Sequence, residues 1–142
     1  MLERQVTANA FSIRFPATFA DVARVLEQIK GELPLSELPD SRLRDLELVL
    51  AESLNNVSEH AYSDGSTGEV ELAVSHRLGV VRVEIRDDGK PLPLSLTGEL
   101  DPVEPTAEGG RGWWLIRTLC KSVDYRRRRG TNCLVLEFIS SD

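Results

Sequence analysis

One stretch of the chain, residues 46–62 with the sequence LELVLAESLNNVSEHAY, constrains the fold more than any other. Read as a helix, it carries a mostly apolar stripe with steps of three and four residues. The stripe consists of Leu46, Leu50, Ser53, Val57 and Ala61. Glu52, Asn56 and His60 repeat every four residues along one flank of that stripe, so a carboxylate, a carboxamide and an imidazole would line one edge of the helix. An amphipathic helix with a polar border would also fit, and other parts of the chain must decide between a structural and a functional edge.

The size and composition of the chain indicate an ordinary globular protein. Its 142 residues suit one domain, 1–142, and its 28% charged and 41% hydrophobic residues are usual for such a domain. The net charge of −6 argues against general nucleic-acid binding, which needs a basic surface. The sequence has no apolar run near the roughly 20 residues that span a membrane, and no apolar signal core at its start, so we expect a soluble cytoplasmic protein without a membrane segment.

The two cysteines, Cys120 and Cys133, have neither a CxxC spacing nor a neighbouring histidine cluster. We therefore expect buried free thiols rather than a disulfide or a metal site.

Hydrophobic periodicity and turn residues predict an alternation of helices and antiparallel-capable hairpins. Strands are expected at 9–15, 69–76, 80–87, 122–127 and 132–139, and helices at 19–33, from Asp40 or Ser41 to about Tyr62, and at 113–120. Thr18 is the expected N-cap of the first helix, and Asp40 or Ser41 that of the second. This order predicts an α+β fold, a two-layer sandwich with helices on one face of a mixed β-sheet.

Residues 88–109 show no periodicity and contain Pro91, Pro93, Pro102 and Pro105. A structureless loop of about twenty residues is uncommon in a compact domain and is often functional. The tract 109–112, Gly-Gly-Arg-Gly, then opens a short helix. Glycines at a helix start let backbone N–H groups approach an anion, aided by the helix dipole.

Two further features leave alternatives open. Asp87 is in phase with the apolar residues Val81, Val83 and Ile85 of its strand, and a buried carboxylate needs a hydrogen-bond donor. It either caps the following turn or serves a ligand. The basic run 126–129 suits a solvated hairpin tip, and a contact with a partner protein is the alternative.

Four signals thus follow one another: Glu52 with Asn56, then Asp87-Asp88-Gly89, a long loop, and a glycine-rich turn. Together they resemble the Bergerat-type (GHKL) ATP-binding fold of gyrase, histidine kinases and mismatch-repair ATPases. Within it, the chain looks most like the anti-sigma factor serine/threonine kinases that act by partner switching. Residues 52–62 are similar to that family's E-x-x-x-N and H-[AG]-Y box, and residues 109–116, GGRGWWLI, to its GGRG-x-x-L-[IM] box. The resemblance runs from about residue 9 to residue 138.

The resemblance implies roles for individual residues. Glu52 would accept or orient the proton of the attacking hydroxyl, and Asn56 would supply an oxygen to Mg²⁺. Asp87 would accept a hydrogen bond from the adenine amino group, and Gly89 would let the backbone pass close to the base.

The glycine-rich turn and the end of the chain complete the implied site. Gly110 and Gly112 would cradle the ATP phosphates and Arg111 would add charge there. Thr131 matches a threonine after glycine that lies near the adenine in the family. His60 is left between a packing role and a hydrogen bond on the phosphate side.

The implied function is that of an ATP-dependent protein serine kinase. Both histidines, His60 and His76, lie inside the domain, so we expect the phosphoacceptor on another protein rather than on a preceding helical segment of a histidine kinase. The resemblance implies a STAS-domain anti-anti-sigma protein as the phosphorylation substrate, a sigma factor or equivalent regulator as the rival ligand, and a homodimer. The homodimer is also expected because the edge of the short strand at 9–15 needs a partner or other cover. The alternative is an ATP-gated protein-binding module without kinase activity, and coincidental motifs in a structural domain are a third interpretation.

Two departures from the family pattern bear on these expectations. Pro91 stands where the family often has the second glycine of D-x-G-x-G, which affects how the loop at about 88–109 would hinge as a lid. Trp113 and Trp114 are heavier than is usual after the GGRG tract, and we expect one to pack in the core and the other to face the lid or a partner.

Overall fold

The computed structural model describes residues 3–7, 9–32, 34–62, 67–92 and 111–141; for residues 3–7 and for Arg111 only the backbone is described. Its strands form a six-stranded sheet in the order β1-β2-β3-β4-β6-β5. The strands are β1 (Glu3–Thr7), β2 (Ala10–Pro16), β3 (Glu69–Arg77), β4 (Val80–Asp87), β5 (Ser122–Arg128) and β6 (Thr131–Ile139). The helices are α1 (Phe19–Ile29), α2 (Asp40–Asn56) and α4 (Arg111–Leu119), with a 3-10 turn η1 (Leu35–Glu37) and a π-helical turn η2 (Val57–Ala61) that prolongs α2.

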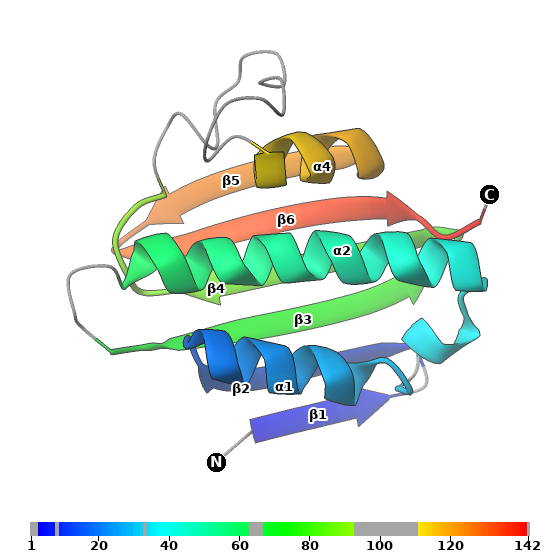
Figure 1. Cartoon of the computed structure of the whole chain (residues 1–142), viewed down its shortest axis with the longest axis horizontal. Coiled ribbons are helices and arrows are strands. Elements are labelled where there is room, and N and C mark those ends of the chain that lie inside the picture. The colour runs from blue at the N-terminus through cyan, green and yellow to red at the C-terminus, as the bar shows by residue number, and fades with distance from the viewer. Residues whose placement is uncertain (1–2, 8, 33, 63–66, 93–110, 142) are drawn as a thin grey trace.

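The three helices lie on one face of the sheet, with α2 across the middle between α1 and α4 (Figure 1). The predicted α+β two-layer sandwich is therefore confirmed. All five strand pairings are antiparallel, whereas the sequence analysis expected a mixed sheet. The reason is the position of β6: the crossover through α4 returns β5 parallel to β4, but β6 lies between these two strands, so no parallel pair forms.

The first strand of the sheet was not predicted. β1 pairs with β2 from Glu3 opposite Arg14 to Thr7 opposite Ala10. The predicted strand at 9–15 is thus not the edge of the sheet: of the two expected possibilities for its edge, a partner chain or other cover, the chain itself supplies the cover through β1.

The two helix starts show one correct and one wrong expectation. Thr18 caps α1, with its Oγ1 accepting a hydrogen bond from the Asp21 N–H at 3.0 Å, as predicted. The N-cap of α2 is Pro39, without a side-chain cap, and Asp40 is the first helical residue. The helix begins one residue early because the Pro39 carbonyl accepts the Leu43 N–H at 2.8 Å, while Asp40 in the first turn complements the helix dipole.

The core lies between the sheet and the helices. Alternate residues of each central strand face the helices and are buried, as strand geometry requires. They include Phe11, Ile13 and Phe15 of β2, Val70, Leu72 and Val74 of β3, Val81, Val83 and Ile85 of β4, and Leu134, Leu136 and Phe138 of β6. From the helices, Val49, Leu50 and Leu54 of α2 and Trp113 and Ile116 of α4 pack against them.

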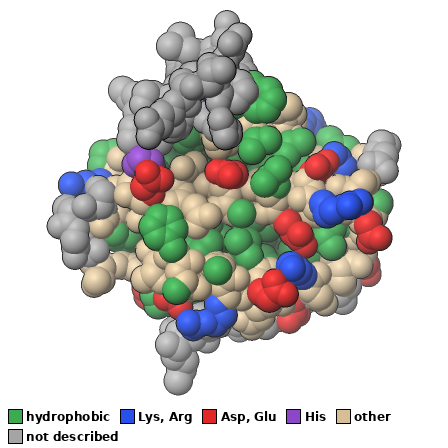
Figure 2. Space-filling view, viewed as in Figure 1, with side chains coloured by type: hydrophobic (Ala, Val, Ile, Leu, Met, Phe, Trp, Pro, Cys, Tyr) green, Lys and Arg blue, Asp and Glu red, His purple; other side chains and the backbone are tan. Residues whose placement is uncertain are grey.

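Two tight hairpins fix the register of the C-terminal strands. Leu78 and Gly79, between β3 and β4, have φ of 52° and 78°, and Arg129 and Gly130, between β5 and β6, have φ of 51° and 80°. Positive φ at both central residues is the geometry of two-residue hairpin turns that match the twist of a sheet. The face that carries the helices presents acidic, basic and hydrophobic side chains side by side (Figure 2). None of the described helices is long and apolar enough to span a membrane.

Candidate functional site

The polar edge of α2 meets the start of α4. A methyl group built on Gly112, the second residue of α4, would lie 2.6 Å from Glu52 Oε2 and 3.8 Å from Asn56 Nδ2. The helical spacing of Glu52 and Asn56 brings both side chains to the same place, and the absence of a side chain at Gly112 makes room for them. The structure thus brings together residues of the sequence box 52–62 and Gly112, the last glycine of the GGRG tract.

Asn56 has an unsatisfied group at this junction. Its Nδ2 is buried and has no hydrogen-bond partner among the described residues. A buried amide nitrogen without a partner is costly unless something binds there, and a carboxamide also offers an oxygen suited to Mg²⁺. The amide of Asn56, next to the glycine-containing start of α4, therefore fits a phosphate-bearing ligand with its metal ion.

His60, the third member of the predicted edge, lies in η2 rather than in the α-helix. A π-turn advances the chain by a smaller angle per residue than an α-helix, so the step from Asn56 to His60 differs from the α-helical step from Glu52 to Asn56. It is partly buried, and its Nε2 is 3.9 Å from Glu59 Oε2. The π-turn, a feature often found at functional sites, was not visible in the spacing of the residues.

Asp87 lies on the helix-facing side of β4 and is 4% exposed. Its Oδ1 accepts hydrogen bonds from the Gly89 N–H at 2.9 Å and from Asn132 Nδ2 at 2.8 Å. The expected contact with the following turn and the donor expected for a buried carboxylate are therefore both present, and both go to Oδ1. Burial raises the pKa of Asp87, while the hydrogen bonds from Asn132 and Gly89 oppose that rise.

Thr131 is not next to the Asp87 carboxylate. Its Oγ1 donates to Asp88 Oδ1 at 2.8 Å, and both side chains are on the sheet face that the helices do not cover. The residue opposite Asp87 in the strand register is Asn132, which is 1% exposed. Because successive side chains of a strand point to opposite faces, the residue after Thr131 reaches the helix-facing side.

Sequence reasoning missed three residues beside Asp87: Asn132, Tyr125 and Arg127. Tyr125 Oη donates to Asn132 Oδ1 at 2.5 Å, and Arg127 Nη1 donates to the same oxygen at 2.9 Å. Arg127 belongs to the basic run that suited a solvated hairpin tip, yet it also donates to the Gly89 carbonyl at 2.8 Å. The alternation of Val123, Tyr125 and Arg127 on one face of β5 was the signal that could have shown this.

Gly89 is held against the end of η2. A Cβ at Gly89 would lie 2.3 Å from the Ala61 carbonyl oxygen, and the next residue, Lys90, donates its N–H to that oxygen at 2.7 Å. This close backbone approach is a structural reason for glycine at position 89, in addition to the expected approach of the backbone to a base.

The remaining predicted site residues are only partly described. Gly110 lies outside the described residues, as do residues 93–109 of the predicted lid at about 88–109. Arg111 is the first residue of α4, and its side chain is outside the description. Trp113 is 3% exposed and packs in the core, as expected for one of the two tryptophans, while Trp114 is half-buried.

A cavity of about 510 Å³ borders the acidic end of β4. It is lined by Asp87 and Asp88 together with Arg14, Tyr62, Thr67, Gly68, Glu69, Val70, Glu71 and Arg86. Tyr62 spans part of it: its hydroxyl donates to the Glu69 carbonyl at 3.0 Å and accepts from the Asp88 N–H at 3.3 Å. Burial raises the pKa of Tyr62, the hydrogen bond from the Asp88 N–H opposes that rise, and the negative charges of Asp87 and Asp88 add to it.

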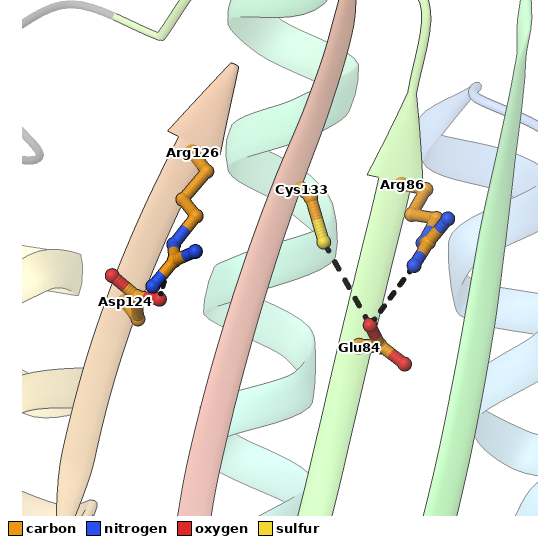
Figure 3. Close-up of polar contacts among 5 residues, drawn as sticks. All are labelled: Glu84, Arg86, Asp124, Arg126 and Cys133. Carbon is orange, nitrogen blue, oxygen red and sulfur yellow. Dashed lines mark hydrogen bonds and ion pairs between the residues drawn. The ribbon is translucent and has the colours of Figure 1, made fainter. Parts of the chain in front are cut away.

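The other face of the sheet carries a separate group of charged side chains. Figure 3 shows Glu84, Arg86, Asp124, Arg126 and Cys133 on the strands, with the helices behind the sheet. Arg86 pairs with Glu84 at 3.1 Å, Arg126 pairs with Asp124 at 3.0 Å, and the Cys133 thiol is 3.9 Å from Glu84 Oε1. These charges neutralise one another in pairs within a strand, and they lie across the sheet from Glu52, Asn56 and Gly112.

Both cysteines are free thiols, as expected, but both are half-buried and not buried as expected. Burial raises the pKa of Cys120 to about 12, and it also raises the pKa of Cys133. Thiols held in the protonated form are poor nucleophiles and metal ligands.

Comparison with known families identifies most of the chain. A family model described as "Histidine kinase-like ATPase domain" matches residues 15–138. The chain is 33% identical over 142 residues to the serine/threonine-protein kinase BtrW of Bordetella bronchiseptica, covering 95% of this chain and 89% of that protein. It is 27% identical over 107 residues to the serine-protein kinase RsbW of Oceanobacillus iheyensis, covering 70% of this chain and 68% of that protein. Over 146 residues it is 25% identical to RsbW of Bacillus subtilis, covering 95% and 89%.

Among solved structures, the fold is similar to that of a blue-light activated histidine kinase of Erythrobacter litoralis, with a TM-score of 0.59 and 22% identity. The similarity covers 86% of this chain and 40% of that kinase. It concerns the fold, since the identity is low.

Proposed function

The chain belongs to the histidine kinase-like ATPase domain family, and on that premise we propose that it is an ATP-dependent protein serine kinase. The domain of residues 1–142 would transfer the γ-phosphoryl group of ATP to a serine of a STAS-domain anti-anti-sigma protein. It would also bind a sigma factor or an equivalent regulator, so that phosphorylation decides which partner is held. The names of the similar proteins, serine-protein kinase RsbW and serine/threonine-protein kinase BtrW, support the kinase activity.

The observation that carries the proposal is the meeting of Glu52, Asn56 and Gly112 where α2 and α4 touch. Phosphoryl transfer needs positioning and charge neutralisation more than covalent help from the protein. A helix N-terminus with a glycine supplies backbone N–H groups for phosphates, and Asn56 supplies an amide whose Nδ2 is otherwise unsatisfied. Gly110 and Arg111, which precede Gly112 in the chain, would extend the same phosphate cradle.

Each protein group then has a definite task. Glu52 takes the proton of the serine hydroxyl while the serine oxygen bonds to the γ-phosphorus and the bond from that phosphorus to ADP breaks. Asn56 would hold Mg²⁺, and that ion would neutralise phosphate charge. Asp87 accepts a hydrogen bond from the adenine amino group through Oδ2, since both hydrogen bonds from described residues go to Oδ1. Thr131, which bonds to Asp88, is left out of the adenine contact.

The test is phosphoryl transfer by Glu52→Gln. This near-isosteric change should leave ATP affinity and helix stability in place, because glutamine is also a good helix former, and should slow transfer by about 10²- to 10⁴-fold. Transfer of ³²P from ATP to recombinant STAS-domain proteins of the same organism measures the effect. Glu47→Gln, on another face of the same helix, is the matched control and should transfer at the wild-type rate.

The outcomes separate the kinase from the alternative. Equal transfer by wild type and Glu52→Gln would remove Glu52 from the mechanism. Binding of ATP without transfer to any of the STAS-domain proteins would favour an ATP-gated protein-binding module instead.

A further inference from the structure

Asn132 uses its whole hydrogen-bonding capacity directly beneath Asp87. Its Nδ2 donates to Asp87 Oδ1 and to the Lys90 carbonyl, both at 2.8 Å. Its Oδ1 accepts from Tyr125 Oη at 2.5 Å and from Arg127 Nη1 at 2.9 Å. A carboxamide offers two donors and two acceptor sites, so all four are engaged.

The chemistry of the neighbours determines which way this amide points. On one side are two oxygens that can only accept, and on the other are a guanidinium that can only donate and a phenol. A flipped amide would place its oxygen against the Asp87 carboxylate and its NH₂ against Arg127. At 1% exposure no water could relieve that mismatch cheaply, so the orientation of Asn132 is fixed.

The same hairpin also holds the backbone that follows Asp87. Arg127 donates to the Gly89 carbonyl at 2.8 Å, Asn132 donates to the Lys90 carbonyl, and the Leu92 N–H donates to Tyr125 Oη at 3.1 Å. Three side chains of β5 and β6 therefore hold both the Asp87 side chain and residues 89–92.

We propose that Asn132, supported by Tyr125 and Arg127, is a positioning residue for nucleobase recognition. By occupying Asp87 Oδ1 it prevents rotation of the carboxylate and leaves Oδ2 as an oriented acceptor for the exocyclic amino group of a 6-aminopurine. Preorganisation of this kind avoids the entropy that a freely rotating acceptor would lose on binding. The inference rests on the proposed ATP binding and adds a residue that acts through Asp87 without touching the nucleotide.

The test compares two nucleotides that differ by one amino group. ATP and the triphosphate of purine riboside, which lacks the 6-amino group, are titrated by calorimetry into wild type, Asn132→Leu, Arg127→Met and Arg126→Met. Arg126→Met is the matched control, because Arg126 is adjacent and exposed but pairs with Asp124 on the opposite face of the sheet (Figure 3). The quantity of interest is the ratio of the two dissociation constants.

Wild type should prefer ATP by about 10- to 100-fold, the worth of a hydrogen bond to a charged group. In Asn132→Leu this ratio should fall to roughly 3-fold or less, and in Arg127→Met it should fall by at least about 3-fold, whereas Arg126→Met should keep the wild-type ratio. A merely structural role would weaken both nucleotides equally and leave the ratio unchanged, which would overturn the inference.

The design also separates this inference from the proposed function. A wild-type protein that binds both nucleotides equally would remove the adenine role of Asp87 and Asn132's role with it. If wild type prefers ATP and the variants keep the same ratio of dissociation constants, only the positioning role of Asn132 would be excluded. If Asn132→Leu does not fold, Arg127→Met against Arg126→Met decides, since both side chains are exposed and neither change touches the core.

Discussion

The candidate site is sensitive to substitution at Gly112, because this residue has only a hydrogen atom as its side chain. A Cβ there would meet the far end of the Glu52 side chain, 2.6 Å from Oε2, and not the backbone. The carboxylate can swing aside at little cost to folding, but it then leaves the position from which it could take a proton. A side chain at residue 112 should therefore affect the rate of phosphoryl transfer more than the stability of the fold.

Gly112→Ala should accordingly be as stable as wild type or slightly more so, since alanine is the better helix former by about 0.5–1 kcal/mol. Its rate of phosphoryl transfer should fall by at least about 10-fold, because a displaced base loses its alignment. Thermal unfolding and the ³²P transfer assay measure the two effects. Gly31→Ala, at an exposed glycine with open space around the Cβ position, is the control and should change neither. A Gly112→Ala protein with the wild-type rate would contradict the assignment of Glu52.

Asp87 should make the ligand-free protein less stable than an amide would. Burial raises its pKa above the usual aspartate value, so its ionised form is disfavoured by folding. The stabilisation from the protonated form is present below the ordinary pKa of about 4, and it is lost as the pH rises through the higher folded-state pKa. The ionised form of buried Asp87 therefore costs folding free energy, which recognition of a ligand would justify.

Asp87→Asn should therefore gain stability relative to wild type between pH 4 and pH 7, because the amide oxygen still accepts from Asn132 and Gly89 while no charge is buried. The same variant should bind ATP much more weakly, since the charged acceptor is lost. Urea denaturation at the two pH values and calorimetry with ATP test both parts. Asp88→Asn, at the exposed neighbour, should show a smaller pH effect. Unchanged ATP affinity in Asp87→Asn would contradict the adenine assignment.

At the scale of elements, the site depends on how α4 is seated on α2 and the sheet. Ile116 and Trp113 bury the inner face of α4, with exposures of 0% and 3%. These two side chains determine where the helix start at Gly112 lies relative to Glu52. Packing of Ile116 in the core thus positions Gly112, about one helical turn earlier in α4, at the candidate site.

Ile116→Ala should destabilise the protein by about 2–5 kcal/mol through lost burial and the cavity left behind. Because nucleotide binding needs the seated helix, excess ADP at a hundred times its dissociation constant should restore about 2.7 kcal/mol. Denaturant unfolding with and without ADP measures both quantities. Thr118→Ala on the exposed side of α4 should stay within about 0.5 kcal/mol of wild type. If ADP did not stabilise either protein, α4 would have no part in nucleotide binding.

At the scale of the whole molecule, the sheet has two outer strands, β1 and β5, each paired on one side within the chain. Unpaired strand edges favour association with another chain. This concerns β1, however, and not the strand at 9–15 on which the sequence argument for a dimer relied.

We retain the homodimer as a prediction, on the resemblance to partner-switching kinases. Light scattering at micromolar concentration should give about twice the mass of the 15.8 kDa chain. A monomer at that concentration and above would refute the prediction.

The sequence by itself determined the features that depend on local spacing. A period of four along α2 was enough to place Glu52 and Asn56 side by side, and a period of two along β4 was enough to bury Asp87 with Val83 and Ile85. Gly79 and Gly130 marked both hairpins, because glycine adopts the positive φ of such turns without strain. The layered α+β architecture followed from the order of these elements.

Only the tertiary structure decided which distant residues meet. That Gly112 lies against Glu52 depends on the packing of α2 against α4, and no local pattern encodes this contact. The end of α2 at Asn56 and the start of α4 at Arg111 are 55 positions apart in the sequence. That Asn132 and not Thr131 reaches Asp87 depends on the register of β6 against β4. A shift of one residue along a strand moves a side chain to the opposite face of the sheet. A motif match can therefore select the residue next to the functional one, and only the pairing with the neighbouring strand shows which of the two faces the helices.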